Sequence, residues 1–318
     1  MSLMNNVGDS MLLRNLMLLA FVTSMAAITA LSHAGATQWI PIKVENGAFL
    51  IETRIGGIDG YSIIDTGAAI NGINQRFIRA NQLDLGSRRS VDIIGAFGRE
   101  RRPLYHRVSV NLFGFDTELQ DVADLNLGRP ELQLMLGAGF LRQFIVQFDY
   151  QNQRMRLLTR DMADMKKLSN VKSKPDQETG GVLAKVRLND EHNTWLMIDT
   201  GATGSTLIDR TIATKRDWLD KFPSEVVLGR GVTSSGILEQ FRLPTLKIGA
   251  FEIADTLISV PAEGQKLELF RKETRTGSNI KRIQSKSKGI LGYDVLKHFV
   301  VTIDYRIGKI HLEPGAAN

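Results

Sequence analysis

Two short stretches of the sequence place an aspartate at the end of an apolar run and follow it with the same three residues. The first is SIIDTGAAI, which contains Asp65, and the second is LMIDTGATG, which contains Asp199. Burying one ionised carboxylate is costly unless it is paired or hydrogen-bonded. A chain that does so twice with the same motif is expected to bring the two carboxylates together.

Such a pair predicts acid–base chemistry. Two neighbouring carboxylates cannot both ionise easily, so they share one proton and have split pKa values. The ionised member can take a proton from a water molecule that attacks a carbonyl, while the protonated member polarises the carbonyl oxygen. Asp65 and Asp199 are therefore the candidate catalytic pair.

The residues behind each aspartate are expected to support the pair. The glycines permit a tight turn whose N–H groups point at a carboxylate. The threonines can hydrogen-bond across the axis that relates the two motifs. The alanines keep the floor of the site small and, since they carry no hydroxyl to stabilise an ionised carboxylate, they predict raised pKa values for the pair. These supporting residues are Thr66, Gly67, Ala68, Thr200, Gly201 and Ala202.

The sequence around these motifs also repeats. Residues 49–68 and 182–202 each predict a strand, a Gly-Gly or Asn-Asp turn, and a second strand that ends at the aspartate. Residues 135–157 and 290–312 each predict a buried strand, a short helix and a hairpin. A duplicated unit places equivalent residues across a pseudo-twofold axis, which would make the two aspartates neighbours.

Other elements are predicted from turn and helix signals. A polar hairpin that contains glycine is expected at 93–110 and again at 226–243, and a helix near 74–82 and again near 208–219. The fold class is therefore all-β, with short helices.

The chain of 318 residues is predicted to contain four segments. Residues 1–36 combine a charged start, a sixteen-residue apolar run and an A-x-A-like end, which is typical of a signal peptide cleaved after Ala36. An uncleaved membrane anchor is the alternative. An N-terminal lobe (37–159), a polar linker (160–180) and a C-terminal lobe (181–318) follow.

Composition excludes several functions. The chain contains no cysteine, which rules out disulfides and thiolate chemistry and favours the periplasm for an exported protein. The five histidines have no ligand spacing, so we expect neither a metal site nor a cofactor. The net charge of +6 does not predict nucleic-acid binding here, but it permits peripheral association with an anionic membrane surface. We expect a monomer.

The motifs together resemble those of the aspartic peptidases. Asp-Thr-Gly-Ala follows an apolar strand, and Met135-Leu136-Gly137 or Ile290-Leu291-Gly292 comes later in each repeat. The alanine is similar to that of retropepsin-like families, and the fused pair of motifs is similar to pepsins. The resemblance covers about residues 47–313. It implies two pseudo-twofold-related acid-protease lobes with a cleft between them, and a hairpin flap over a bound extended peptide.

The resemblance also implies which residues meet a substrate. At the hairpin tips these are Gly95, Phe97, Gly231 and Ser234. A flap tyrosine of the pepsin type is missing, since the first hairpin offers only Phe97 near its tip and Tyr105 further along.

The implied function is an endopeptidase that hydrolyses peptide bonds in an extended polypeptide through a water activated by Asp65 and Asp199. Two alternatives stay open: structural carboxylates that cap turns of a β-sandwich, and a catalytically silent peptide-binding protein of the same fold. Asp149 and Asp304 share the repeat but are interpreted as turn residues. A basic insertion at 261–290 is expected to border the cleft.

Overall fold

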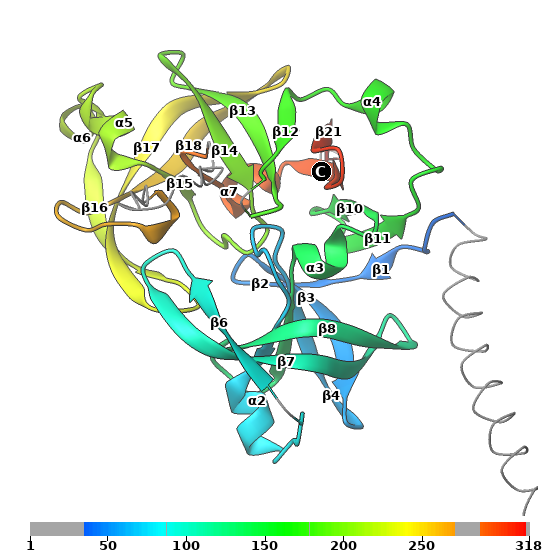
Figure 1. Ribbon diagram of the computed structural model, residues 1–318. Helices are drawn as coiled ribbons and strands as arrows, with labels where there is room; N and C mark the ends of the chain where they lie inside the picture. Colours follow the sequence, from blue (N-terminus) through cyan, green and yellow to red (C-terminus); the bar gives the residue numbers. More distant parts are fainter. Residues whose placement is uncertain (1–34, 87, 178, 271–286, 316–318) are drawn as a thin grey trace, which may run out of the picture.

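The computed structural model describes residues 35–270 and 287–315, except positions 87 and 178 (Figure 1). Most of the predicted signal peptide and the middle of the basic insertion therefore lie outside the described residues. Within those residues the protein is all-β with short helices, which confirms the predicted fold class. It contains two eight-stranded sheets and one five-stranded sheet.

The first eight-stranded sheet comes from the N-terminal half of the chain. From one edge to the other its strands are β2 (Lys43–Glu45), β3 (Ala48–Ile55), β4 (Ile58–Ile64), β9 (Leu132–Leu136), β5 (Gly72–Asn74), β8 (Phe115–Leu125), β7 (Arg99–Leu112) and β6 (Arg88–Ile94). Strand β3 also pairs with β7, so the sheet curls upon itself.

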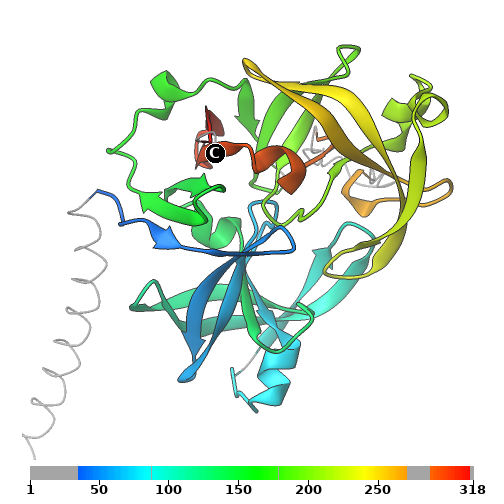
Figure 2. The ribbon, with the colours of Figure 1, turned by 180° about the vertical axis from the view of Figure 1, so that it is seen from behind.

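The second eight-stranded sheet repeats this order in the C-terminal half. Its strands are β12 (Ser173–Pro175), β13 (Val182–Leu188), β14 (His192–Ile198), β19 (Gly289–Leu291), β15 (Thr206–Ile208), β18 (Phe251–Pro261), β17 (Ser235–Ile248) and β16 (Ser224–Arg230). The additional pairing of β13 with β17 matches that of β3 with β7. The first sheet lies below the second in both Figure 1 and Figure 2.

The five-stranded sheet takes strands from both halves. Its order is β1 (Ile40–Pro41), β11 (Arg154–Leu158), β10 (Ile145–Asp149), β20 (Phe299–Asp304) and β21 (Lys309–Pro314). Strands β10 and β20 are antiparallel neighbours, and Gln147 lies opposite Thr302. The Gln147 side-chain amide donates to the Thr302 hydroxyl over 2.8 Å, in a buried position.

The helices are short. They are α2 (Gln75–Ala80), α3 (Ala138–Leu141), α4 (Met165–Leu168), α5 (Arg210–Thr214), α6 (Trp218–Lys221), α7 (Tyr293–Leu296) and a 3-10 turn η1 (Glu268–Phe270). Asn74 and Asp209 cap α2 and α5 at equivalent places, as expected from their side-chain oxygens. The single helix predicted near 208–219 is instead two helices, because Asp217 adopts a left-handed conformation (φ 56°) between them.

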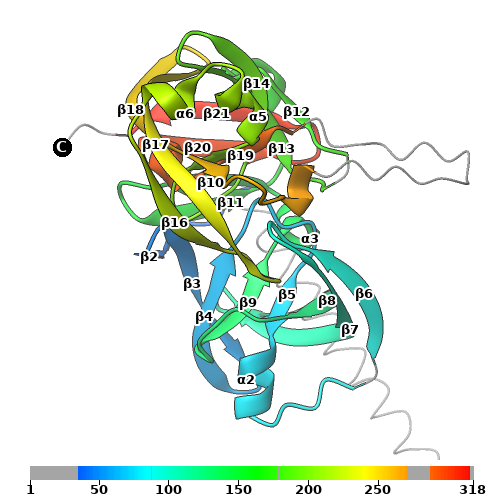
Figure 3. The same cartoon turned by 90° about the vertical axis from the view of Figure 1, so that its left-hand side faces the viewer.

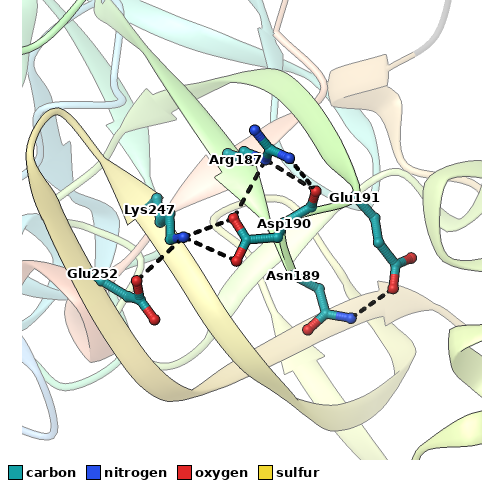
Figure 4. Close-up of polar contacts among 6 residues, drawn as sticks. All are labelled: Arg187, Asn189, Asp190, Glu191, Lys247 and Glu252. Carbon is teal, nitrogen blue, oxygen red and sulfur yellow. Dashed lines mark hydrogen bonds and ion pairs between the residues drawn. The ribbon is translucent and has the colours of Figure 1, made fainter.

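The predicted turns before both motifs are present. Gly56 and Gly57 have positive φ (59° and 79°), and so do Asn189 and Asp190 (46° and 54°), which suits tight hairpin turns. Lys247, from β17, lies 2.8 Å from the Asp190 carboxylate (Figure 4). This exposed contact lowers the pKa of Asp190 and fastens the β13–β14 turn to the edge of the β17–β18 hairpin.

The segment predicted as a linker is partly built into the fold. Strand β12 pairs with β13, so the second sheet begins inside residues 160–180. Helix α4 begins after the capping side chain of Asp164, and its Met165 is buried. Although the segment is mostly polar, two of its apolar residues, Met165 and Val171, are only 2% and 4% exposed and so pack into the fold.

The N-terminal end of the described chain adds to the shared sheet. Ala36 forms a bridge to Leu158, and the Thr37 N–H donates to the Leu157 carbonyl over 2.9 Å. The predicted cleavage point after Ala36 thus borders a paired segment. None of the helices in the described ranges is long and apolar enough to cross a membrane.

The buried bond between Gln147 and Thr302 gives a test of the shared sheet. Thr302→Val removes the acceptor while keeping the shape, and it leaves a buried amide without that partner. We expect the free energy of unfolding in urea to fall by about 1–3 kcal/mol. Thr117→Val, at a half-buried position of β8 away from this sheet, is the control. Equal effects of both substitutions would contradict a specific role for the bond.

Candidate active site

The strands bring the two aspartates to equivalent positions. Asp65 directly follows β4 and Asp199 directly follows β14. The Asp65 N–H donates to the carbonyl of Leu136 over 3.0 Å, and the Asp199 N–H donates to that of Leu291 over 3.2 Å. Parallel pairing of β4 with β9, and of β14 with β19, fixes both chain directions at this point. Each carboxyl group lies against the glycine of the opposite motif, so the two aspartates are close neighbours.

The threonines link the two motifs as the sequence predicted. The Thr66 hydroxyl donates to the Ile198 carbonyl and accepts from the Thr200 N–H, each over 2.9 Å. The Thr200 hydroxyl donates to the Ile64 carbonyl over 2.7 Å and accepts from the Thr66 N–H over 3.1 Å. Both side chains are buried, so the four bonds join the ends of β4 and β14 away from water.

The glycines hold the carboxylates in two ways. The Gly67 N–H donates to Asp65 Oδ1 over 2.9 Å, and the Gly201 N–H donates to Asp199 Oδ1 over 2.7 Å. Each glycine also faces the other motif: a Cβ on Gly67 would lie 2.5 Å from Asp199 Cγ, and one on Gly201 would lie 2.5 Å from Asp65 Cγ. Only glycine therefore leaves room for the opposite carboxylate.

The alanines connect the motif loops to the following helices. The Ala68 carbonyl accepts from the Ala138 N–H over 2.8 Å, and the Ala202 carbonyl accepts from the Tyr293 N–H over 2.9 Å. The glycine before each helix is needed for this approach, since a Cβ on Gly137 would lie 2.7 Å from the Ala68 carbonyl oxygen. The later Leu-Gly landmarks of each repeat thus support the motif loops directly.

The two aspartates differ in their surroundings. Burial raises the pKa of Asp65, against hydrogen bonds from Asp199 and from the N–H groups of Ala68 and Gly67. Burial raises the pKa of Asp199 well above its ordinary value, and the charge of Asp65 raises it further. Asp199 is only 8% exposed, whereas Asp65 is half-buried. Because the two carboxyl groups interact, their pKa values belong to the pair as a whole.

Apolar side chains lie on both sides of the pair. A first apolar cluster, beside Ala68, includes Ile93, Ala123, Leu125 and Met135. A second apolar cluster, beside Ala202, includes Leu183, Met197, Leu207, Leu238, Leu267 and Ile290. Strands β6, β8 and β9 of the first half supply the first cluster, and strands β13, β14, β15, β17 and β19 of the second half supply most of the second, so each motif alanine lies against an apolar wall.

The four residues predicted at the hairpin tips lie at two tips that meet. Gly95 and Phe97 lie in the turn of the first hairpin, β6–β7, and Gly231 and Ser234 lie in the turn of the second hairpin, β16–β17. The turns meet in Figure 1 and Figure 3, and the Thr233 hydroxyl donates to the Gly98 carbonyl over 3.0 Å. Phe97 packs against the second apolar cluster.

The structure adds two tyrosines that the motif search passed over. Tyr150 and Tyr305 follow the repeated aspartates of the shared sheet and are 6% and 3% exposed. Burial raises the pKa of both well above the ordinary value, and the charge of Asp199 raises both further. The Tyr305 hydroxyl lies near Thr66, but it forms no hydrogen bond of ordinary geometry. In the sequence, the only sign that these tyrosines belong to the site is that each follows one of the repeated aspartates, Asp149 and Asp304.

Other candidates have structural roles. Asp149 accepts from the Asn152 N–H over 3.2 Å and from Arg154 Nε over 2.8 Å, and Asp304 accepts from the Arg306 N–H over 2.9 Å, so both hold turns, as interpreted. Tyr105 is buried at 3% exposure. Over the described ranges, no group of three or more His, Asp or Glu side chains could hold a metal ion.

The threonine bonds can be tested by stability. Thr66→Val keeps the shape but removes both bonds of the Thr66 hydroxyl. It leaves the Ile198 carbonyl and the Thr200 N–H without these partners. We expect a loss of about 2–4 kcal/mol in the free energy of unfolding, measured by urea denaturation. Thr66→Ser retains the hydroxyl and should recover most of the loss, and equal losses for Val and Ser would refute this account.

The raised pKa of Asp199 gives a pH-dependent prediction. An acid whose folded pKa is raised stabilises the fold below its unfolded pKa of about 3.9, and this stability is lost as pH rises through the folded pKa. Asp199→Asn removes the titration and keeps an oxygen for the Gly201 N–H. Relative to wild type, it should therefore gain up to roughly 1.4 kcal/mol for each pH unit between the two pKa values.

Asp149→Asn is the matched control, because its shift has the opposite sign. Burial acts to raise the pKa of Asp149, but hydrogen bonds from Asn152 and Arg154 outweigh it and lower the pKa. This substitution should cost about 1–3 kcal/mol at neutral pH and progressively less as the pH falls below about 3.9. Thermal unfolding of both variants from pH 3 to 8 measures the two trends, and parallel trends would contradict the assignment.

The chain matches no family model and no curated protein. What the site does must therefore be argued from the carboxylate pair, the threonine bonds and the apolar clusters themselves.

Proposed function

We propose that the protein is an aspartic endopeptidase that cleaves extended polypeptide. One observation carries the proposal: each of Asp65 and Asp199 is held by the N–H of its own glycine and lies directly against the glycine of the opposite motif. Two carboxylates this close share one proton, which is the state that water activation needs. The resemblance of both motifs to aspartic peptidases adds to this.

The environments assign different roles to the two aspartates. Asp65 accepts from two backbone N–H groups, those of Gly67 and Ala68, each over 2.9 Å, and these bonds favour its ionised form. Asp199 is more deeply buried, and burial raises its pKa well above the ordinary value, which favours its protonated form. Asp65 is then the general base and Asp199 the general acid.

The proposed reaction follows from these roles. Asp65 takes a proton from a water whose oxygen attacks the peptide carbonyl carbon, and Asp199 gives its proton to the carbonyl oxygen. The tetrahedral intermediate is a neutral gem-diol. Asp65 then gives its proton to the leaving nitrogen while Asp199 recovers one from a hydroxyl, so the C–N bond breaks and the pair returns to its starting state.

The two apolar clusters favour a polypeptide as the substrate. The first and second apolar clusters lie beside Ala68 and Ala202, one on each side of the aspartates. Apolar side chains on both sides of a scissile bond would be taken out of water there, which favours binding. Following the predicted signal peptide, we propose that the protein works in the periplasm.

The activity depends on both carboxylates in this proposal. Asp65→Asn and Asp199→Asn should each lower kcat on an unfolded model protein by at least about 10³-fold, and the double variant should be no worse than either. Because both pKa values are raised, activity should extend to mildly acidic and near-neutral pH. Cleavage confined to below about pH 3 would contradict this.

Binding of a transition-state mimic separates the enzyme from a silent peptide-binding protein. Wild type should bind a statine-containing peptide far more tightly than the parent peptide, and Asp199→Asn should lose this preference. Equal affinity of wild type for both peptides, together with no cleavage, would favour the peptide-binding alternative. Asp149→Asn is the control, because its carboxylate lies at a turn of the shared sheet.

A further inference from the structure

The tips of the first and second hairpins are built alike. The first tip, residues 95–98, is closed by the Gly95 N–H donating to the Gly98 carbonyl over 2.9 Å. The second tip, residues 231–234, is closed by the Gly231 N–H donating to the Ser234 carbonyl over 2.9 Å. Both hairpins end a curled sheet and reach toward each other from opposite halves (Figure 3). Their contacts with each other, however, are not symmetric.

The Phe97 side chain lies in a notch made by two glycines of the second hairpin. Gly229 of β16 and Gly236 are direct partners in the β16–β17 pairing. A Cβ on Gly229 would lie 2.5 Å from Phe97 Cζ, and a Cβ on Gly236 would collide with the Phe97 ring. The aromatic ring therefore packs directly against the backbone of the opposite hairpin, which any larger residue in the notch would prevent.

Each tip also places an apolar side chain in the wall of the opposite half. Phe97, from the first hairpin, packs against the second apolar cluster beside Ala202. Val232, from the second hairpin, packs against the first apolar cluster beside Ala68. The walls that would receive substrate side chains are therefore covered by the protein's own residues.

The start of the basic insertion contacts the first tip as well as strand β17 of the second hairpin, where the Ala262 N–H donates to the Ile237 carbonyl over 3.0 Å. The Glu268 N–H donates to the Ala96 carbonyl over 3.0 Å, and Leu267 is buried in the second apolar cluster. The first half connects the equivalent strands β8 and β9 through residues 126–131 alone, so it has no counterpart of this segment. One tip is thus held by a segment that the duplicated unit itself does not contain.

We infer that these contacts form an autoinhibitory latch. Phe97 and Leu267 pack in the second apolar cluster, beside Ala202, and a polypeptide reaches the aspartates only after the first tip withdraws from the glycine notch. The inference rests on the proposed function, since it names what limits access to the same site. If the open form is a minor state of about 10% or less, the latch lowers apparent affinity about tenfold or more.

A reversible disulfide tests the latch directly. A Cβ on Gly231 would lie 3.6 Å from Ala96 Cβ, which suits a disulfide, and the sequence contains no cysteine that could compete. The variant Ala96→Cys/Gly231→Cys should form the bond under mild oxidation. Oxidised protein should then bind a statine-containing peptide at least about 100-fold more slowly than the same protein after reduction. The two single-cysteine variants control for the substitutions.

Removing the ring should have the opposite effect. Phe97→Ala empties the notch, so the same peptide should associate about tenfold faster or more. A residue that merely holds substrate would give slower or weaker binding. Ile94→Ala is the matched control, because Ile94 lies on the same hairpin and is 47% exposed. It should leave the association rate unchanged.

The outcomes separate the latch from the proposed function. Failure of the disulfide to form, equal association rates for oxidised and reduced protein, or no gain from Phe97→Ala would each overturn the latch alone. If the disulfide forms but reduced protein binds no statine-containing peptide, the proposed function fails and the inhibitory role fails with it. Slow association only when oxidised, with a gain in Phe97→Ala, supports both.

Discussion

The reciprocal hydrogen bonds of Thr66 and Thr200 are the constraint on which the rest of the site depends. Each hydroxyl donates one hydrogen bond to a strand carbonyl and accepts another from an N–H of the opposite motif. Because the groups are buried, a small displacement of one motif would leave several of them without partners, which is costly. The ends of β4 and β14 are therefore held in one relative position. The closeness of the carboxylates is a consequence of this alignment, and it persists despite the burial and the charge of Asp65 that raise the pKa of Asp199.

Close packing also determines which residues can stand around the aspartate pair. Gly67 and Gly201 are needed because the opposite carboxylate occupies the place of a Cβ, and Gly137 is needed because a carbonyl does so. Neither motif glycine is among the residues with positive φ, so their role is close approach rather than an unusual backbone conformation. The site thus combines two unfavourable features, a shared buried charge and tight backbone contacts, that persist only because the surrounding sheets over-determine them.

Much of this could be predicted from the sequence, because the relevant signals are local or repeated. The motif aspartates, the Gly56-Gly57 and Asn189-Asp190 turns and the hairpins all follow from residue type and spacing. The threonine bonds could be predicted once the two motifs were assumed to meet. Contacts between distant segments could not. Nothing local to Phe97 indicates that Gly229 and Gly236 would receive its ring, and nothing local to Leu267 indicates a partner on the first hairpin. Strand β12 was missed because its partner β13, rather than its own polar sequence, makes it a strand.

The five-stranded sheet has a consequence for the order in which the chain can fold. The neighbour of strand β10, strand β20, lies roughly 150 residues further along the chain, so the first half cannot complete this sheet alone. Ile145, Val146 and Phe148 are fully buried in the final sheet, so strand β10 without this neighbour exposes an apolar, unpaired edge of the kind that aggregates. The first half alone is thus the part of the chain most exposed to edge-to-edge aggregation until the last two strands pair with it.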